Sequence, residues 1–418
     1  MAAQSAVVPS SAKAGSMSNN SCPRLLLCDG QGVQGLRVSV PGMKETDRYA
    51  SLLECGGSRF MLNLEEPRCT RMRVLLSDRH FSSPRGVFGT CGQHHGYGRL
   101  TPNAAAACSA DGQTLSVVGG QRMDFPDGNA TPTSGVWLTS AKVEAATGGG
   151  SPAAAIPNDW SEPTLAADGD RAHCFEQRVP SKCASKDFHG HCEFDGRLSL
   201  IHHGGQMLLY ARANLHPCGG GRHVQLARSD DGGATWSAFE LVRIQRYELR
   251  QRSNIYFFHV QHSRTTGELV ALYPAVIENG AGGAGVFASF SSDGAIWTAP
   301  EPLLRSATRF GDRVPDWPVG MVEGHLPTDQ GEADTQQAGV QSTSSVHVFL
   351  QHDVRLGGVH GMPEQERERG RQTFLCRYKL PGGWLRWRKR REAAIAKDPA
   401  ACRDHTTGET PVEKTARH

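Results

Sequence analysis

The chain has 418 residues, 45 of them basic and 42 acidic, so its formal net charge is only +3. A nearly balanced charge gives no argument for a nucleic-acid partner or a membrane surface, and no apolar run approaches the roughly 18 residues that would cross a bilayer. The 48 glycines and 23 prolines favour many short strands joined by tight turns.

The N-terminal residues 1–23 lack the continuous apolar segment of a signal peptide, and we interpret them as a disordered leader. With no signal peptide and no transmembrane segment evident, a cytoplasmic location is the default expectation. The twelve cysteines form no C-x-x-C pair and no zinc-ligand spacing, which favours free thiols over a disulfide framework. We therefore expect neither a metal nor another cofactor.

A short apolar strand recurs five times along the chain, and each copy lies between two other short strands. Four of the five copies follow a glycine within one or two residues, as a hairpin turn requires. The copies begin at Ser58, Gln113, Gln206, Glu268 and Ser345.

Five such units of antiparallel strands, with no convincing amphipathic helix between them, predict an all-β fold. A single unit cannot bury both of its faces, so neighbouring units must stack on one another, and radial stacking gives a β-propeller. The repeats predict five blades, or six if the strand near residue 25 and the C-terminal segment form another blade. We expect one propeller domain over residues 24–385 and a basic, disordered tail over residues 386–418.

The segment RSDDGGATWS, residues 228–237, combines an aspartate, two glycines and a tryptophan in one tight turn. In such a turn, serine and aspartate side chains bond nearby backbone N–H groups, and glycine supplies a conformation that other residues resist. We therefore assign the segment a structural role. Five of its residues fit the pattern S-x-D-x-G-x-T-W and resemble the Asp-box of the sialidase superfamily of propellers: Ser229, Asp231, Gly233, Thr235 and Trp236.

The chain resembles that superfamily over most of residues 47–379, and the segment SSDGAIW, residues 291–297, is a partial second copy of the turn. The resemblance implies an exo-α-sialidase-like glycoside hydrolase that acts on a terminal acidic sugar, so its expected partner is a glycan. Three arginines hold the sugar carboxylate in sialidases. The segment GRLSLIHHGGQMLLYARAN is similar to the strand pair that carries the key arginine, which corresponds to Arg197.

Arginines recur where the innermost strand of each unit begins, beside the central channel where a propeller carries its chemistry. Converging guanidinium groups would bind a carboxylate bidentately. The alternative is that each arginine pairs with a neighbouring aspartate and only stiffens the channel. The candidate substrate-binding residues are Arg48, Arg99, Arg197, Arg252 and Arg313.

The candidate catalytic residues depart from the sialidase pattern. The loop 214–223 contains no acid where the resemblance implies one, and Tyr247 is only a candidate for the nucleophilic tyrosine. Glu193 and Asp195 lie two residues apart and would face the same way on a strand, so they could act in a glycosidase without a tyrosine nucleophile.

Two other functions remain open: a catalytically inactive propeller that binds glycans or a protein partner, and a five-bladed furanosidase-like glycosidase. Two further motifs receive structural interpretations. We interpret His202 and His203 as a solvated hairpin end, not as a metal site, and the basic segment 386–391 as a solvated tail.

Overall fold

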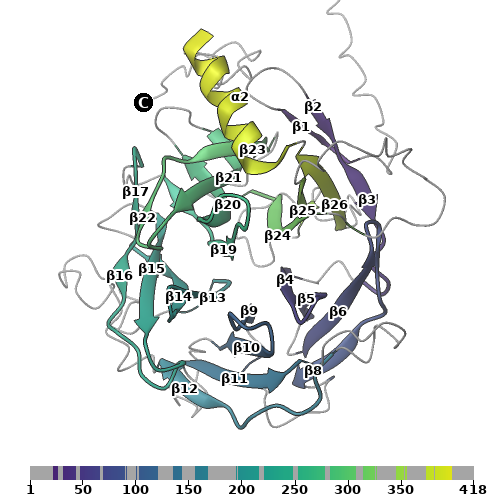
Figure 1. Ribbon diagram of the computed structural model, residues 1–418, viewed down its shortest axis with the longest axis vertical. Coiled ribbons are helices and arrows are strands. Elements are labelled where there is room, and N and C mark those ends of the chain that lie inside the picture. The colour runs from purple at the N-terminus through teal and green to yellow at the C-terminus, as the bar shows by residue number, and fades with distance from the viewer. Residues whose placement is uncertain are drawn as a thin grey trace, which may run out of the picture.

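The second strand of each repeated unit is buried on both faces, because neighbouring sheets cover it from either side. All nine residues of β20 (Leu269–Ile277) are buried, and so are all seven of β25 (Val346–His352). The sheets stack radially as blades around a central channel (Figure 1). The prediction of an all-β propeller with five blades is confirmed.

The computed structural model describes residues 22–26, 32–43, 48–65, 69–89, 91, 100, 103–120, 135–143, 156–167, 194, 196–215, 221–247, 253–277, 283–306, 314–324, 326, 345–352, 354, 373–380 and 382–397.

The first three blades follow one another along the chain, each with its first strand beside the channel. The first blade contains β4 (Arg48–Cys55), β5 (Ser58–Glu65), β6 (Cys69–Ser77), β7 (His80–Phe81) and β8 (Arg85–Gly89). The second contains β9 (Ala105–Cys108), β10 (Thr114–Gly119), β11 (Val136–Lys142) and β12 (Thr164–Ala167). The third contains β13 (Ser199–His203), β14 (Gln206–Asn214), β15 (Arg222–Ser229) and β16 (Glu240–Leu241).

The fourth blade has a divided innermost strand, and the fifth takes its outermost strand from the N-terminal part of the chain. The fourth contains β18 (Asn254–Ile255), β19 (His259–His262), β20, β21 (Gly283–Ser291) and β23 (Glu301–Arg305). The fifth contains β24 (Trp317–Glu323), β25, β26 (Phe374–Leu380) and β3 (Leu36–Val38). Two small two-stranded sheets lie outside the blades: β1 (Arg24–Leu26) with β2 (Gly32–Gln34), and β17 (Arg243–Ile244) with β22 (Ile296–Trp297).

The ring is closed by the pairing of β3 with β26. Leu36 lies opposite Arg377 and Val38 opposite Leu375 in this antiparallel pair. The N-terminal strand therefore completes the fifth blade and does not build a sixth. An ion pair of 2.9 Å between Arg377 and Asp78 then joins the fifth blade to the first.

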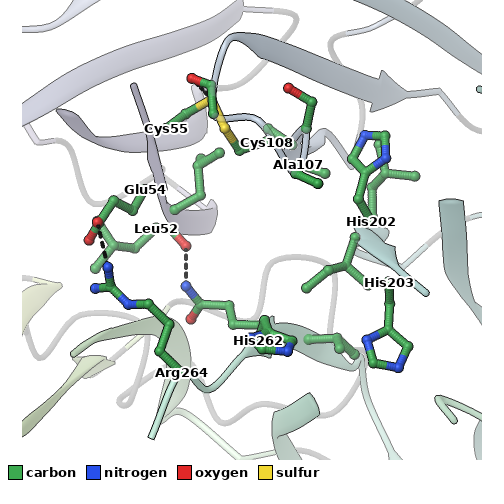
Figure 2. A pocket seen from close by; sticks show the side chains of 18 of the residues that line it. Leu52, Glu54, Cys55, Ala107, Cys108, His202, His203, His262 and Arg264 are labelled. Atoms are coloured by element: carbon green, nitrogen blue, oxygen red, sulfur yellow. Dashed lines mark hydrogen bonds and ion pairs between the residues drawn. A yellow bond between two sulfur atoms is a disulfide. The ribbon is translucent and has the colours of Figure 1, made fainter. Parts of the chain in front are cut away.

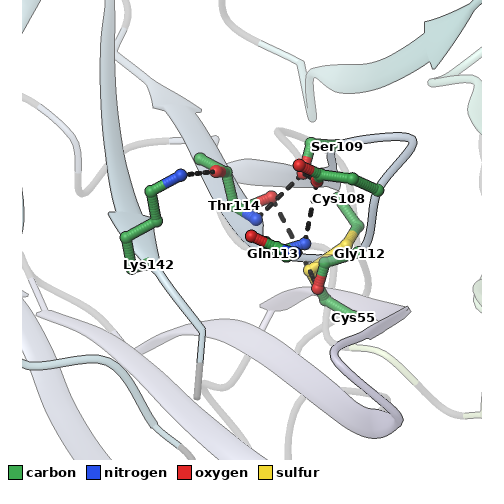
Figure 3. The surroundings of a disulfide bond; sticks show 8 residues. Cys55, Cys108, Ser109, Gly112, Gln113, Thr114 and Lys142 are labelled. Atoms are coloured by element: carbon green, nitrogen blue, oxygen red, sulfur yellow. Dashed lines mark hydrogen bonds between the residues drawn. A yellow bond between two sulfur atoms is a disulfide. The ribbon is translucent and has the colours of Figure 1, made fainter. Parts of the chain in front are cut away.

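Disulfide bonds reinforce the closure, so the expectation of free thiols was wrong for the described cysteines. Cys22–Cys376 ties the N-terminal segment to β26, across 354 residues of sequence. Cys55–Cys108 joins the ends of β4 and β9 in neighbouring blades (Figure 3). Cys69–Cys91 lies within the first blade. Such bonds are typical of proteins that fold in an oxidising environment, which argues against the default expectation of a cytoplasmic location.

The segment expected to begin a disordered tail forms helix α2 (Gly383–Lys397). Trp384 and Trp387 on this helix are buried, and Trp384 meets Phe290 of β21 edge-on at 5.5 Å between ring centroids. Arg388 forms an ion pair of 2.8 Å with Glu268 beside β20. Residues 386–397 are thus attached to the outside of the fourth blade, while residues 1–21 and 398–418 lie outside the described part.

The turn after β15 is held by its own side chains. Ser229 Oγ accepts from Gly233 N at 2.8 Å, and Asp231 Oδ1 accepts from Thr235 N at 2.8 Å. Hydrogen bonds from the Thr235 hydroxyl, from Thr235 N and from the Ser229 hydroxyl lower the pKa of Asp231 to about 2. Trp236 Nε1 donates to Gly233 O at 3.0 Å. Ser229 Oγ and Asp231 Oδ1 hold backbone N–H groups of the turn, and Asp231 Oδ2 accepts from the Thr235 hydroxyl.

The turn after β21 repeats this arrangement and shows what both turns do. Gly294 N donates to Ser291 Oγ at 2.9 Å, and Asp293 Oδ1 accepts from the next two backbone N–H groups. Gly294 O in turn accepts from the Tyr210 hydroxyl of the third blade at 3.0 Å. A Cβ on Gly233 would likewise approach Leu138 of the second blade at 2.3 Å. Each turn therefore contacts the preceding blade.

A pair of glycine substitutions separates backbone strain from this contact between blades. Gly232 and Gly233 both have positive φ, +73° and +97°, but a Cβ on Gly232 meets nothing within 4 Å. We expect Gly232→Ala to lower the free energy of unfolding by about 1 kcal/mol, and Gly233→Ala to lower it by about 1–3 kcal/mol more. Urea unfolding curves of both variants measure these changes. Equal losses of stability in the two variants would show that the turn does not pack against the second blade.

The ring-closing disulfide is expected to contribute more stability than the disulfide within the first blade. A cross-link stabilises by restricting the unfolded chain, and this restriction grows with the length of the closed loop. The double variant Cys22→Ser/Cys376→Ser should therefore lose about 2 kcal/mol more than Cys69→Ser/Cys91→Ser, whose partners lie 22 residues apart. Differential scanning fluorimetry of both double variants measures the difference. A larger loss in the second variant would contradict it.

Candidate functional site

Side chains from all five blades enclose a cavity of about 580 Å³ where the innermost strands end (Figure 2). This volume lies within the range of small-molecule sites. Much of the wall is apolar and includes Leu52, Ala107, Ile201, Val260 and Met321. The cavity lies at the opposite end of the channel from the strand beginnings that the arginine pattern had indicated.

Gln261 on β19 bridges the channel and limits the cavity. Its amide nitrogen donates to Leu52 O in the first blade and to Met321 O in the fifth, each at 3.1 Å. Its amide oxygen accepts from Met321 N at 2.6 Å. A Cβ on Gly320 would come within 2.8 Å of that oxygen, so the absence of a side chain lets β24 approach this closely.

A directed chain of hydrogen bonds continues from Gln261 into the channel. The Gln261 amide oxygen lies 3.1 Å from His259 Nε2 and is an acceptor, so His259 carries its proton on Nε2. His259 Nδ1 is then free to accept from the Arg197 guanidinium at 2.6 Å. Burial and the nearby Arg197 hold the pKa of His259 well below its usual range, which keeps the ring neutral.

Arg197, the strongest of the predicted substrate-binding residues, is completely surrounded by protein. It is 1% exposed and donates to Pro318 O at 2.8 Å, besides its bond to His259. Burial lowers its pKa to about 9, which leaves it charged at neutral pH. Its guanidinium also lies 5.0 Å from the centroid of the Phe257 ring. In this structure Arg197 joins blades, and carboxylate binding by it stays a prediction.

Glu323 lies on the cavity wall, but other groups already use its carboxylate. Ser263 Oγ donates to it at 2.6 Å, Arg264 N at 2.7 Å, and Thr265 donates through both N and Oγ1 at 3.1 and 2.9 Å. Four donors saturate a carboxylate. Glu323 therefore holds the turn after β19 and has no lone pair left for acid–base chemistry.

Glu54, the second acid of the wall, is also paired. Arg264 lies 3.3 Å from one of its oxygens and Arg59 lies 3.2 Å from the other. Figure 2 shows the Glu54–Arg264 pair on one side of the cavity, across from His202 and His203. The acidic and basic side chains of this wall thus neutralise one another.

Three histidines provide the remaining polar edges of the cavity. His203 Nε2 lies 2.9 Å from Ser292 O, and the His203 and His262 rings are 6.0 Å apart between centroids. The buried Nε2 of His202 has no hydrogen-bond partner. Burial lowers the pKa of both His202 and His262. At neutral pH these two rings are uncharged and offer hydrogen bonds rather than charge.

Aromatic side chains from three blades meet at the other end of the channel, where the innermost strands begin. Tyr49 stacks on Trp317 at 5.2 Å, and Phe257 meets Trp317 edge-on at 5.5 Å. Tyr49 has φ of +51°, an unusual conformation for a bulky residue and one often found at functional sites. We call the following residues the aromatic cluster: Tyr49, Tyr256, Phe257 and Trp317.

The other candidate site residues are not brought together by the described structure. Tyr247 stacks on His223 at 5.4 Å, away from the cavity lining and the aromatic cluster, and burial raises the pKa of its phenol. A raised pKa is the opposite of what a tyrosine nucleophile needs. The backbone of Arg48 lies in β4. The following candidates lie outside the described residues: Arg99, Glu193, Asp195, Arg252 and Arg313.

No local sequence pattern signals the cavity itself. The sequence suggests a solvated hairpin end for His202 and His203, whereas in the structure they line the cavity together with residues of the other four blades. Glu54, His262 and Arg264 lie beside hairpin turns, where polar residues are common on any propeller. Their convergence depends on the ring and leaves no local pattern.

The described residues contain no group of three or more histidine, cysteine or acidic side chains arranged to hold a metal ion. The one described helix, α2, is not long and apolar enough to cross a membrane.

Comparison with known proteins identifies similar architectures only. No protein-family model matches the sequence, and no curated protein sequence matches it. Among solved structures, an N-acetylgalactosamine deacetylase from F. plautii in complex with blood group B trisaccharide is similar, with a TM-score of 0.43 and 12% identity over 80% of this chain and 86% of that chain.

Two further similar structures are an α-L-arabinofuranosidase from Podospora anserina and an α-L-arabinanase from Penicillium chrysogenum. The first has a TM-score of 0.42 and 9% identity over 82% of this chain and 94% of its own. The second has a TM-score of 0.40 and 10% identity over 83% of this chain and 97% of its own. With TM-scores below 0.5, function has to be argued from the residues of this chain.

The two acids of the cavity wall are expected to differ in their contribution to stability. Glu323→Gln removes a buried carboxylate and places an amide N–H group against backbone N–H groups. It should therefore lower the free energy of unfolding by about 2–4 kcal/mol. Glu54→Gln breaks pairs with partly exposed arginines and should cost less than about 1 kcal/mol. Urea unfolding of both variants measures this. A Glu323→Gln protein of unchanged stability would show that the carboxylate does not stabilise the turn after β19.

Proposed function

We propose that the protein is a glycoside hydrolase whose glycan substrate binds at the aromatic cluster, where the innermost strands begin. One observation carries this proposal: Tyr49, Arg197 and Trp317, from three different blades, all contact the Phe257 ring. Small-molecule sites combine aromatic surfaces with a few polar groups, and the partly exposed Tyr49 would offer its face to a sugar ring while the buried rings of the cluster hold it in place.

The carboxylates that such an enzyme needs are available next to these three residues in the sequence. Asp47 precedes Tyr49 by two positions, Asp195 precedes Arg197 by two, and Asp312 precedes Trp317 by five. These acids lie outside the described residues, but the residues that follow them meet around one ring. This supports Asp195, or Glu193 beside it, as one carboxylate and Asp47 or Asp312 as the other.

A pair of carboxylates is sufficient for glycoside hydrolysis. One carboxylic acid protonates the departing glycosidic oxygen, and the second carboxylate either attacks the sugar or activates a water molecule. No tyrosine nucleophile is required. The proposed mechanism therefore assigns no step to Tyr247, whose phenol stacks on His223 and has a raised pKa.

The structure supports a neutral glycan better than an acidic one. Sialidase propellers have six blades whereas this ring has five, as furanosidase propellers do. Both terminal guanidinium nitrogens of Arg197 donate to protein acceptors and the side chain is buried, so only its Nε, which has no described partner, is left for a carboxylate. We therefore favour a five-bladed, furanosidase-like hydrolase over an exo-α-sialidase.

Release of 4-nitrophenol from a panel of aryl glycosides tests the proposal. We expect turnover of a neutral furanoside and none of an α-sialoside. Asp195→Asn should lower kcat about 100-fold or more, because a positioned acid or base contributes about that factor. Tyr49→Ala should mainly raise KM. Glu54→Gln, at the opposite end of the channel, is the matched control and should retain full turnover.

Three results would count against this assignment. Hydrolysis of the sialoside would restore the sialidase interpretation. Full activity of Asp195→Asn, Glu193→Gln, Asp47→Asn and Asp312→Asn would remove the carboxylate mechanism. Binding of glycans that Tyr49→Ala weakens, without turnover of any substrate, would show a glycan-binding propeller that has no catalytic activity.

A further inference from the structure

We propose that the cavity where the innermost strands end is a second binding site, which takes a neutral polyhydroxy compound such as a monosaccharide or a cyclic polyol. This site is separate from the glycan site proposed at the aromatic cluster and does not depend on that proposal.

Protein atoms between the two ends keep the sites apart. Gln261 bridges Leu52 O and Met321 O, and the next atoms along the channel are those of His259 and the buried Arg197. His259 and Gln261 line the cavity, whereas Arg197 contacts Phe257 of the aromatic cluster. A ligand in the cavity would therefore not reach the glycan site.

The charges around the cavity favour a neutral ligand. Four donors saturate Glu323, and Glu54 is paired with Arg59 and Arg264. His202 and His262 have lowered pKa values, because burial disfavours their charged forms. The charges of the two glutamates and the two arginines sum to zero, so these described side chains offer no net charge to attract an ion.

The polar groups that remain match hydroxyl groups. His203 Nε2 faces Ser292 O, an acceptor, so the proton of that contact lies on Nε2, and in this tautomer Nδ1 is an acceptor. His262, 6.0 Å from His203 between ring centroids, adds a second imidazole edge. A hydroxyl group can donate to such a nitrogen or accept from an N–H, which suits it to rings of either tautomer.

The walls between the histidines match the carbon faces of the same compounds. Leu52, Leu53, Ala107, Leu200 and Ile201 are buried or half-buried and line the cavity. A compound with C–H faces and hydroxyl edges contacts both kinds of surface at once. A hydrocarbon would leave the imidazoles unpaired, and an ion would leave its charge uncompensated.

The cavity is also preformed, which reduces the cost of binding. The disulfide Cys55–Cys108 fixes the ends of β4 and β9 at its rim, and Ser109 and Gly112 continue that rim (Figure 3). Glu323 holds the turn after β19 on the far side. A site whose walls do not have to become ordered keeps more of its contact energy as affinity.

Calorimetric titration of the full chain with D-glucose and with myo-inositol at neutral pH tests the proposal. We expect a dissociation constant of about 1–10 mM for at least one of them, as for small ligands held by a few contacts. His203→Phe keeps the ring but removes both nitrogens and should weaken binding about five-fold or more. His262→Trp adds bulk at an exposed position of the lining and should abolish binding.

Tyr49→Ala is the matched control, because it alters only the glycan site, and it should leave this binding unchanged. Binding that Tyr49→Ala removes and His203→Phe does not would place the ligand at the aromatic cluster and overturn the proposal. Binding of acetate or phosphate in place of the polyols, or no binding up to about 100 mM, would overturn it as well. Turnover of aryl glycosides enters none of these measurements, so the two proposals can fail independently.

Discussion

The pairing of β3 with β26 is the constraint on which both ends of the channel depend. It joins an N-terminal segment to the last strand of the fifth blade, and the Cys22–Cys376 disulfide and the Arg377–Asp78 ion pair hold the same seam. Tyr49 stacks on Trp317 across this seam, between the first and fifth blades. Gln261 bridges the same two blades. An open ring would therefore lose the aromatic cluster and the cavity together.

Two short polar turns make contacts between neighbouring blades. Gly233 contacts Leu138 of the second blade, and Gly294 accepts a hydrogen bond from Tyr210 of the third. A blade buries its broad faces through apolar contacts, which fix distance but not angle. Hydrogen-bonded turns at the edges add the directional contacts. This explains why aspartate, serine and tryptophan recur in the two turns without a chemical role.

The sequence predicts what is local and repeated, and it misses what the closed ring brings together. Five apolar strands, four of them after a glycine, indicated five blades, and a turn pattern indicated the side-chain hydrogen bonds around Asp231. Gln261 and Leu52, by contrast, are 209 residues apart, and the partners of the ring-closing disulfide are separated by 354. No periodicity links such positions. For the same reason, Glu54 and Glu323 could not be recognised from sequence as acids of one wall.

The two ends of the channel differ in whether their charged and polar groups already have partners within the protein. Where the innermost strands end, Glu54 and Glu323 have their oxygens bound to protein donors, and burial lowers the pKa values of His202 and His262. Acid–base catalysis needs a carboxylate that can exchange a proton, so this end can bind but is poorly equipped to react.

At the other end Arg197 is a buried cation whose described partners, Pro318 O and His259, are neutral. A buried charge of this kind calls for a nearby anion, and the acids that precede Tyr49, Arg197 and Trp317 in sequence are the groups able to supply it. Electrostatics and sequence therefore assign any hydrolytic chemistry to the beginnings of the innermost strands.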